Sequence, residues 1–405
     1  MEKLLKILVG LMLILFQLYY LLPNYIVIVL KIAIPLIVLL LHYHLNKEKK
    51  IKNMDFLIWF FTFFLVGIIS IFYTVSDYES LDVVISLISS FLTLFVISQF
   101  IKNEKDIDYI VSCLIIGGLI YAMYILVRQG SSILDGINAE YVGGTGMLFS
   151  YIVTPTIIYV VWRIFYSKNY KMLYISSFCL LYFLSLMSGG KKTFMIPLIF
   201  IAVLVFLKFK KSLIKISIGM TFLIVLTYYL YDIAMKNQKF YDILGIRIES
   251  FLNYFTQNGR VDGSTRERVA LIDESWDVFL NNPLKGVGIG AFKELSSSGL
   301  YSHNNYLELL TGVGIIGFMI FYMVYLYLVP KLMKISFYSN EKYSNLLLAF
   351  LIINLIQDIG TVSYYRTTFL IPICLSYCYI RLYKEKNIGN ERKLILNEKH
   401  LHSKQ

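Results

Sequence analysis

Long apolar runs follow one another along this chain and limit what it can fold into. About 20 apolar residues in a helix span the hydrocarbon core of a bilayer. Runs of this kind lie at 4–22, 25–45, 55–76, 81–101, 107–128, 141–166, 170–188, 193–209, 212–231, 308–329, 344–363 and 367–383. The sequence therefore predicts an all-α membrane protein with about twelve transmembrane helices.

The composition excludes an ordinary soluble domain. Hydrophobic residues make up 58% and charged residues 16% of the chain, and the mean hydropathy is +0.66. Soluble domains have about 45–50% apolar and about 25% charged residues. The cysteines lie inside apolar runs, so we expect buried thiols without disulfides or a bound metal; they are Cys113, Cys179, Cys374 and Cys378. The first run is too long for a signal-peptide core, so we expect it to remain as a span.

The positions of lysine and arginine predict the orientation in the membrane, because cytoplasmic loops are enriched in both. With the N-terminus inside, alternate loops carry the basic residues, as at 47–52, 208–215 and the tail from Arg381. Short outer turns such as Ser76–Ser80 are acidic or neutral. Both termini are therefore expected in the cytoplasm. The formal net charge of +12 follows from this topology, so it does not indicate a nucleic-acid partner.

This topology divides the chain into four regions. Residues 1–231 hold nine spans, 232–307 form one large extracytoplasmic loop, 308–383 hold three spans, and 384–405 form a polar cytoplasmic tail. A loop of this length is usually functional or disordered. Acidic and basic residues nearly balance in it, so each of its cations needs a local explanation.

The large loop contains the pattern of an amphipathic helix. Ser264-x-x-Glu267 has the spacing of a capping box. Apolar residues then recur on one face at helical spacing: Val269, Ile272, Trp276, Phe279 and Leu280. The sequence Asn-Asn-Pro at 281–283 ends the pattern. We expect a helix that lies on the outer leaflet or over the bundle.

One histidine stands apart from the others. His42, His44, His400 and His402 are expected to be solvated, whereas His303 is the only histidine on the outer side of the predicted topology. By itself, His303 is most simply an interfacial or helix-capping residue. The positive end of the helix that it opens favours a neutral imidazole, which a general base requires.

Several residues on either side of His303 allow two interpretations. Asn304 and Glu308 are candidates to orient His303 or an acceptor substrate, and Glu308 is equally compatible with an acid on the surface of the helix. Gly286-x-Gly288-x-Gly290 does not join a strand to a helix, which excludes a dinucleotide site. Gly288 and Gly290 instead suit either a tight turn or a backbone cradle for phosphate.

Glycines also recur inside the span that follows His303. Gly312, Gly314 and Gly317 have the spacing at which small residues allow helices to approach closely. We therefore expect these three glycines to serve helix packing.

Several cations lie on the predicted outer side. Lys191 and Lys192 follow Ser188-Gly189-Gly190, and Arg366 follows Asp358, Tyr364 and Tyr365 in the last outer turn. A charge near the membrane indicates function, although snorkelling explains a lysine equally well. Together with Arg266 and Arg268, these side chains are expected to form a cationic pocket for a pyrophosphate.

The sequence shows no metal-ligand cluster, and acidic pairs are sparse on the outer side. We therefore expect chemistry without a metal and without a cofactor.

These residues carry a resemblance. His303-Asn304, followed after nine residues by Gly314-x-x-Gly317, resembles the signature of the O-antigen ligase and polymerase superfamily. Arg268 and the run NPLKGVGIGAF at 282–292 match the segment that leads to that histidine in the family. Ser188–Lys191 resembles an earlier turn of the family, with lysine where arginine is usual. The resemblance is specific over about 265–317.

The resemblance implies a GT-C-like glycosyltransferase at the outer face of the bacterial cytoplasmic membrane. Its donors would be undecaprenyl-diphosphate-linked glycans, without nucleotide sugar or metal. His303 would accept a proton from the acceptor hydroxyl, while Arg268, Arg266 and Lys191 or Lys192 would stabilise the departing diphosphate. A flippase and a chain-length regulator of the same pathway are the protein partners that the resemblance implies.

The motif does not separate polymerases, which join repeat units into capsular, O-antigen or other exopolysaccharide, from ligases, which move a finished glycan to another acceptor. The abundance of Lys, Ile, Asn, Phe and Tyr suggests an AT-rich genome, and many such bacteria have a capsule but no lipopolysaccharide core, which favours a polymerase. A flippase is the third alternative. Transporters often carry charges near the bilayer midplane, and these spans are nearly free of charge, which favours an enzyme.

Overall fold

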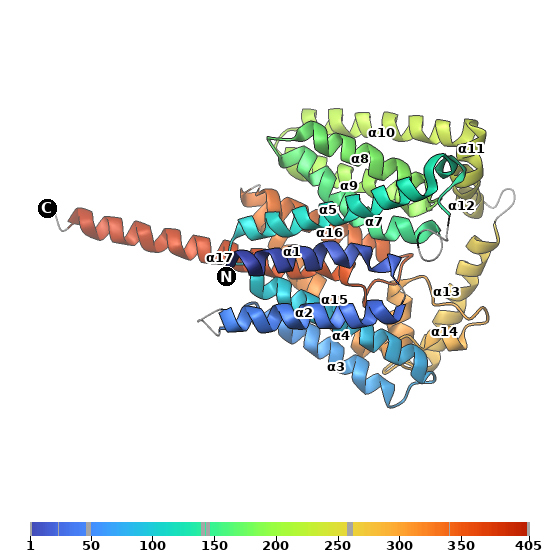
Figure 1. The fold of residues 1–405 in the computed structure, drawn as a ribbon, viewed down its shortest axis with the longest axis horizontal. Helices are drawn as coiled ribbons and strands as arrows, with labels where there is room; N and C mark the ends of the chain where they lie inside the picture. The colour runs from blue at the N-terminus through green and yellow to red at the C-terminus, as the bar shows by residue number, and fades with distance from the viewer. Residues whose placement is uncertain are drawn as a thin grey trace.

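The chain forms a bundle of α-helices in a computed structural model (Figure 1). The structure describes residues 2–22, 24–45, 50–138, 142, 146–256, 262–339 and 341–402. No strand occurs among these residues, so the expected all-α fold is confirmed for the part of the chain that is described.

In the part of the chain that the structure describes, twelve long helices coincide with the predicted spans. They are α1 (Glu2–Leu18), α2 (Asn24–Leu45), α3 (Met54–Ile71), α4 (Asp77–Phe100), α5 (Glu104–Gln129), α7 (Gly146–Tyr166), α8 (Lys171–Met187), α9 (Lys191–Phe209), α10 (Leu213–Lys236), α15 (Asn305–Ser339), α16 (Lys342–Asp358) and α17 (Thr367–His402). Among the described residues, 7 helices are long and apolar enough to cross a membrane: α2, α3, α4, α5, α9, α10 and α15. A multi-pass membrane protein is thus supported, while the number of twelve spans stays a prediction.

The segment between α10 and α15 lies at one end of the bundle and the two termini at the other (Figure 1). We call the end opposite the termini the distal end. The distal segment contains α11 (Gln238–Phe240), a π-helical turn (Tyr241–Gly245), α12 (Ile246–Thr256), α13 (Gly263–Asn281) and α14 (Phe292–Leu295). The predicted tail begins as a direct continuation of α17, which stays helical to His402, and 403–405 lie outside the described residues.

Helix α13 confirms the amphipathic helix expected after Ser264, with two corrections. Its N-cap is Asp262, whose Oδ1 accepts the backbone N–H of Thr265 at 2.6 Å, and Ser264 Oγ donates to the same carboxylate at 3.0 Å. Of the two positions expected for its apolar face, on the outer leaflet or over the bundle, the second is wrong at Ile272 and Trp276, which are exposed. The helix packs instead through a neighbouring face that includes Leu271 and Ser275, because that face lies against α15.

Helix α15 is not the straight span that was expected. Gly314 has φ 63° and ψ −171°, so the helix breaks there after a short N-terminal piece. The carbonyls of Thr311 and Gly312 accept the N–H groups of Val287 at 2.8 Å and Gly288 at 2.9 Å. A Cβ on Gly314 would lie 2.3 Å from the Leu284 carbonyl oxygen. Gly314 therefore allows a helix break with close backbone contact, which corrects the helix-packing role expected for it.

The other span glycines do support close packing. A Cβ on Gly312 would lie 3.2 Å from the carbonyl oxygen of Gly288, and a Cβ on Gly317 would lie 3.2 Å from Val66 on α3. The glycine-rich segment at 286–290 thus packs against the glycines at the start of α15. This contact fixes where the segment before His303 meets the bundle.

Two further expectations about single residues are wrong. Cys113, Cys374 and Cys378 are buried thiols as expected, but Cys179 is exposed on α8. His42 is buried on α2 and makes an edge contact with the ring of Tyr43, so it is not solvated. His44 is exposed, and the side chains of His400 and His402 lie outside the described part.

Candidate functional site

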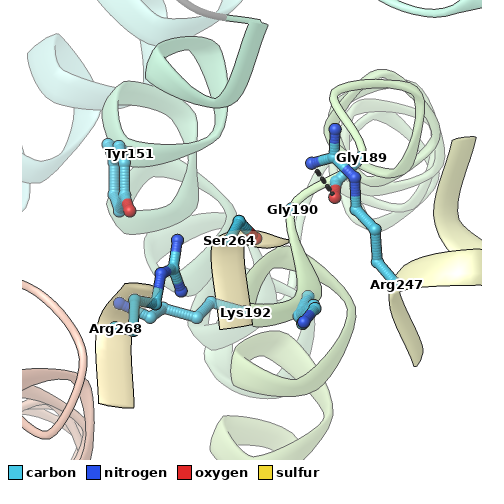
Figure 2. A pocket seen from close by; sticks show the side chains of 8 residues that line it. Tyr151, Gly189, Gly190, Lys192, Arg247, Ser264 and Arg268 are labelled. Carbon is cyan, nitrogen blue, oxygen red and sulfur yellow. Dashed lines mark hydrogen bonds between the residues drawn. The ribbon is translucent and has the colours of Figure 1, made fainter. Parts of the chain in front are cut away.

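A pocket opens at the distal end, where the start of α9 meets α7, α12 and α13 (Figure 2). It encloses about 420 Å³ of empty space, part of which is open to solvent. Its lining residues are Tyr151, Gly189, Gly190, Lys191, Lys192, Arg247, Ser264 and Arg268. Among the described residues, half of this lining is cationic and none of it is acidic, so the pocket suits an anion.

The backbone at the start of α9 shapes one wall of the pocket. Gly189 has φ +71°, and a Cβ there would lie 2.9 Å from the Ile243 carbonyl oxygen. Only glycine accepts this conformation and this closeness without strain. Gly190 caps α9, whose first N–H groups contribute positive potential. Arg247 completes the wall, since its Nη1 donates to the Gly189 carbonyl at 2.7 Å (Figure 2).

Lys191 is balanced by an internal partner. Its Nζ donates to Thr265 Oγ1 at 2.8 Å and lies 3.4 Å from Asp262 Oδ2. Burial of Asp262 opposes its ionisation, but hydrogen bonds from Ser250, Thr265 and Ser264 hold the pKa of this carboxyl well below its usual range. The Asp262 carboxylate is therefore charged and offsets Lys191.

Lys192, in the first turn of α9, and Arg366, in the connection between α16 and α17, approach the ring of one tyrosine. The Lys192 ammonium donates a hydrogen bond to Thr361, in the turn between α16 and α17. It lies 5.8 Å from the ring centre of Tyr151, and the Arg366 guanidinium lies 5.8 Å from the same centre. The last outer turn therefore lies beside the lining residue Tyr151, although Arg366 is not itself a lining residue.

Arg268 occupies the pocket between Tyr151 and Lys192 (Figure 2). Within the part of the chain that the structure describes, it makes no hydrogen bond or ion pair. A partly buried guanidinium of this kind has five N–H donors to offer to a ligand.

His303 lies close enough to these cations to respond to their charge. Burial lowers its pKa to about 4, and the positive charges of Arg268, Lys192 and Arg366 add to this effect. Its imidazole is therefore neutral near pH 7. Its ring packs against that of Tyr301, with centroids 4.2 Å apart, and its φ of 56° places it at a tight turn before α15.

Asn304 and Glu308 hold the backbone on either side of His303. Asn304 caps α15, because its Oδ1 accepts the N–H groups of Tyr306 at 2.9 Å and Leu307 at 3.2 Å. Glu308 is 3% exposed and accepts the N–H of Ser302 at 2.8 Å. Glu308 is thus not the surface acid that one interpretation expected.

Asp358 lies beneath this turn and is fully buried. Its carboxylate accepts hydrogen bonds from Tyr322 OH at 2.8 Å, Ser363 Oγ at 2.5 Å and Asn305 Nδ2 at 3.3 Å. With these bonds it holds the loop between α16 and α17 in place and is not among the lining residues of the pocket.

Asn305 links the two loops that carry His303 and Arg366. Its Oδ1 accepts the N–H groups of Ser363 at 2.7 Å and Tyr364 at 3.0 Å. Nothing in the sequence pattern distinguished Asn305 from Asn304, because the bonds of Asn305 reach a loop almost sixty residues away.

Of the predicted site residues, Lys191, Lys192 and Arg268 line the pocket. His303, Asn304, Glu308, Asp358 and Arg366 do not line it, and three others lie elsewhere. Arg266 is exposed and points away from the lining face of α13. Gly288 packs against the connection between α3 and α4, and Gly290 packs against α4 itself. A Cβ on them would lie 2.1 Å from Thr74 and 2.7 Å from Val83, respectively. The Gly288 N–H already donates to Gly312, so the tight-turn interpretation fits and the phosphate cradle does not.

Three lining residues were not predicted from the sequence: Tyr151, Arg247 and Ser264. The only sign of Arg247 was its position among the cations of the large loop. Its pocket contact is with Gly189, 58 positions away, so no local pattern could reveal it.

The chain matches no protein-family model, and the comparison with curated proteins returns no similar sequence. Among the described residues, no group of three or more His, Cys, Asp or Glu side chains is arranged to hold a metal ion. The described residues thus form an anion pocket with one unpaired guanidinium, that of Arg268, whose charge acts on the neutral His303 outside the lining.

Proposed function

We propose that this protein transfers a glycan from a polyprenyl diphosphate to a sugar hydroxyl, at the outer face of a bacterial cytoplasmic membrane. The observation that carries the proposal is the position of Arg268, which lies unpaired among the described residues and close to the neutral His303. The motif resemblance at 265–317 adds the donor class, undecaprenyl-diphosphate-linked glycans.

The pocket suits the diphosphate of such a donor. Arginine binds phosphate oxygens in a bidentate manner, and a helix N-terminus adds N–H groups. Arg247, Arg268 and Lys192 would surround the anion, while Lys191 is already balanced by Asp262. The lipid part of the donor would extend along the apolar spans that end beside the pocket.

The proposed reaction is an inverting displacement. The acceptor hydroxyl gives its proton to the neutral imidazole of His303, and its oxygen forms a bond with the anomeric carbon. The bond between that carbon and the diphosphate oxygen breaks, and the polyprenyl diphosphate leaves with the electron pair. The cations of the pocket stabilise the charge that grows on this leaving group. The arriving diphosphate also offsets the positive charges near His303, which makes the imidazole a better proton acceptor.

We propose a polymerase of lipid-linked repeat units as the most specific form of this function. The AT-rich composition favours a capsule or related exopolysaccharide over attachment to a lipopolysaccharide core. A ligase would use the same pocket, and a flippase would use the anion site without His303. Twelve spans of the GT-C type and two cytoplasmic termini belong to this proposal, as do a flippase and a chain-length regulator as partners.

Deletion of the gene separates these possibilities when the surface glycan is run on a gel. Loss of the ladder of glycan bands with a single repeat unit retained supports a polymerase. Long chains that stay unattached indicate a ligase, and repeat units trapped inside the cell indicate a flippase.

His303→Ala should insert normally and give single repeat units on the lipid carrier. Full-length polymer from this variant would contradict the role of His303 as the base.

A further inference from the structure

Helix α13 leaves part of its apolar surface uncovered. Ile272, Trp276 and Leu280 are 40%, 48% and 57% exposed. The same helix packs on α15 and buries Leu271 and Ser275. We call the three exposed side chains the α13 stripe.

The α13 stripe lies between the buried face of the helix and its polar face. In a helix of 3.6 residues per turn, each step of four residues turns by about 40°, so the stripe forms one connected row. It borders the buried face on one side. The acidic residues Asp273 and Asp277, which are exposed, lie on its other side. An apolar row between a packed face and a charged face indicates a helix that meets an apolar phase along one flank.

The apolar surface continues from the stripe to the surfaces of two spans. Leu284, which follows the end of α13, is 64% exposed and touches the break of α15 at Gly314. Ile316, just beyond that break, is 54% exposed. Nearby, Tyr73 OH donates to the Lys285 carbonyl at 2.7 Å. Tyr73 follows Phe72 at the end of α3, and Phe72 is 86% exposed. Helices α3 and α15 are both apolar enough to face lipid.

The direction of α13 fits a position along a membrane surface. Figure 1 shows the helix crossing the distal end of the bundle at a steep angle to the spans. A helix with this direction lies roughly in the plane of the membrane if the spans cross it. Tryptophan is the residue type that prefers the boundary between headgroups and acyl chains.

We propose that α13 is an interfacial helix whose stripe inserts into the phospholipid surface at the distal end. The membrane, through Ile272, Trp276 and Leu280, then fixes the depth at which α13 lies. Arg268 precedes Ile272 by one turn, so the pocket is held at the level of the lipid headgroups, where the diphosphate of a lipid-linked donor is found. This last consequence rests on the proposed function, but the lipid contact does not.

Tryptophan fluorescence in lipid tests the contact without any substrate. The full chain is reconstituted in phosphatidylcholine vesicles, with and without bromine atoms on the acyl chains, and the signal of Trp276→Phe is subtracted from that of the wild type. The other two tryptophans, Trp59 and Trp162, are buried and cancel in the difference. We expect brominated lipid to quench most of the Trp276 signal and aqueous iodide to quench little of it.

A matched variant places the probe on the polar side of the same helix. Ala270 is exposed on that side, so Ala270→Trp in the Trp276→Phe background should show the opposite pattern, with quenching by iodide and little by brominated lipid. Three results would overturn the proposal. In the first, iodide quenches Trp276 and brominated lipid does not. In the second, neither quencher reaches Trp276, as expected if a second copy or another protein covers it. In the third, brominated lipid quenches the tryptophans at 270 and 276 equally. None of these results depends on the glycan assay, so the two proposals fail separately.

Discussion

The cations of the pocket differ in whether their charge is already balanced inside the protein. Lys191 is bound to Asp262 and Thr265, whereas Arg268 has no such partner among the described residues. A bound anion gains most from Arg268, because no internal contact has to be given up. Arg266 lies two residues earlier on the same helix but outside the pocket, so it offers a control with the same charge.

Arg268→Gln is expected to lower kcat for glycan transfer by about two to three orders of magnitude, because one such interaction contributes about 2.7–4 kcal/mol to lowering the barrier. Arg266→Gln should leave kcat close to the wild-type value. The measurement is turnover of lipid-linked repeat units by the purified variants in nanodiscs. Similar losses in the two variants would show that Arg268 acts through general charge and not through the pocket.

His303 should give the free protein an acid limb in its pH profile. The neutral imidazole is the active form, so kcat/KM is expected to fall only as the pH drops through about 4, the pKa of His303. Arg268→Gln removes one of the charges that lower this pKa, so the limb should move to higher pH, toward the ordinary histidine value of about 6.5. Kinetics measured between pH 3 and 8 and an NMR titration of the histidines report the same shift independently. An unmoved limb would exclude this coupling between Arg268 and His303.

At the scale of elements, the break in α15 decides where the site can form. Gly314 has backbone angles that residues other than glycine rarely adopt, and it lies against the backbone of Leu284. The break frees the carbonyls of Thr311 and Gly312 for the glycine-rich segment. The short first piece of α15 can then present His303 and its capping residue Asn304 beside the last outer turn.

Gly314→Ala is expected to destabilise the protein by roughly 1–3 kcal/mol from the backbone angles alone, and the contact with Leu284 adds to this. Gly263→Ala is the control, since nothing lies within 4 Å of a Cβ at that position and alanine favours the helix that begins there. Thermal unfolding in detergent should show a clearly lower Tm for Gly314→Ala and an unchanged or slightly higher Tm for Gly263→Ala. Equal Tm values for the two variants would mean that the helix break does not require glycine at position 314.

The elements that sequence analysis located well are those set by local chemistry. The bounds of α13 follow from capping residues at its start and the Asn-Asn-Pro sequence at its end, so both could be predicted within a few residues. Which face of α13 is buried depends on α15, and the break at Gly314 depends on a partner segment that the glycine itself does not reveal. Both therefore escaped prediction.

In the site, too, residues grouped by a sequence pattern were predicted and residues that depend on distant contacts were not. Lys192, Arg268, Arg366 and His303 were expected together because a motif and a topology grouped them, and the structure places them near one another. Arg247 and Asn305 were missed because each acts through a contact far along the chain, with Gly189 and with Ser363. Arg266 was grouped with Arg268 by closeness in sequence, although two positions on a helix point in different directions.

At the scale of the whole molecule, the pocket uses charge differently from a cluster of ion pairs near the other end of the bundle. Toward the end with the termini, Asp108 binds Arg163 at 2.8 Å and Lys342 at 3.2 Å, and Tyr343 OH donates to it at 2.6 Å. These bonds join α5, α7 and α16 and leave the carboxylate balanced. At the distal end, the pocket gathers four cations, and no acidic side chain lines it in the part of the chain that the structure describes. The first arrangement stabilises the bundle, and the second is suited to a ligand.

The positions of the termini and of α13 predict how the molecule lies in the membrane. Both termini share one end and α13 lies at the other (Figure 1), so reporters at these positions should give opposite results. Alkaline phosphatase, which is active only outside the cytoplasm, is expected to be active when fused after Asn282 and inactive when fused after Lys386. Green fluorescent protein should fluoresce only at the second position, and a fusion after Lys50, between α2 and α3, should behave like the second. Phosphatase activity at Lys386 would place the pocket on the cytoplasmic side, where a lipid-linked polymer could not be assembled for the cell surface, and the proposed function would have to be abandoned.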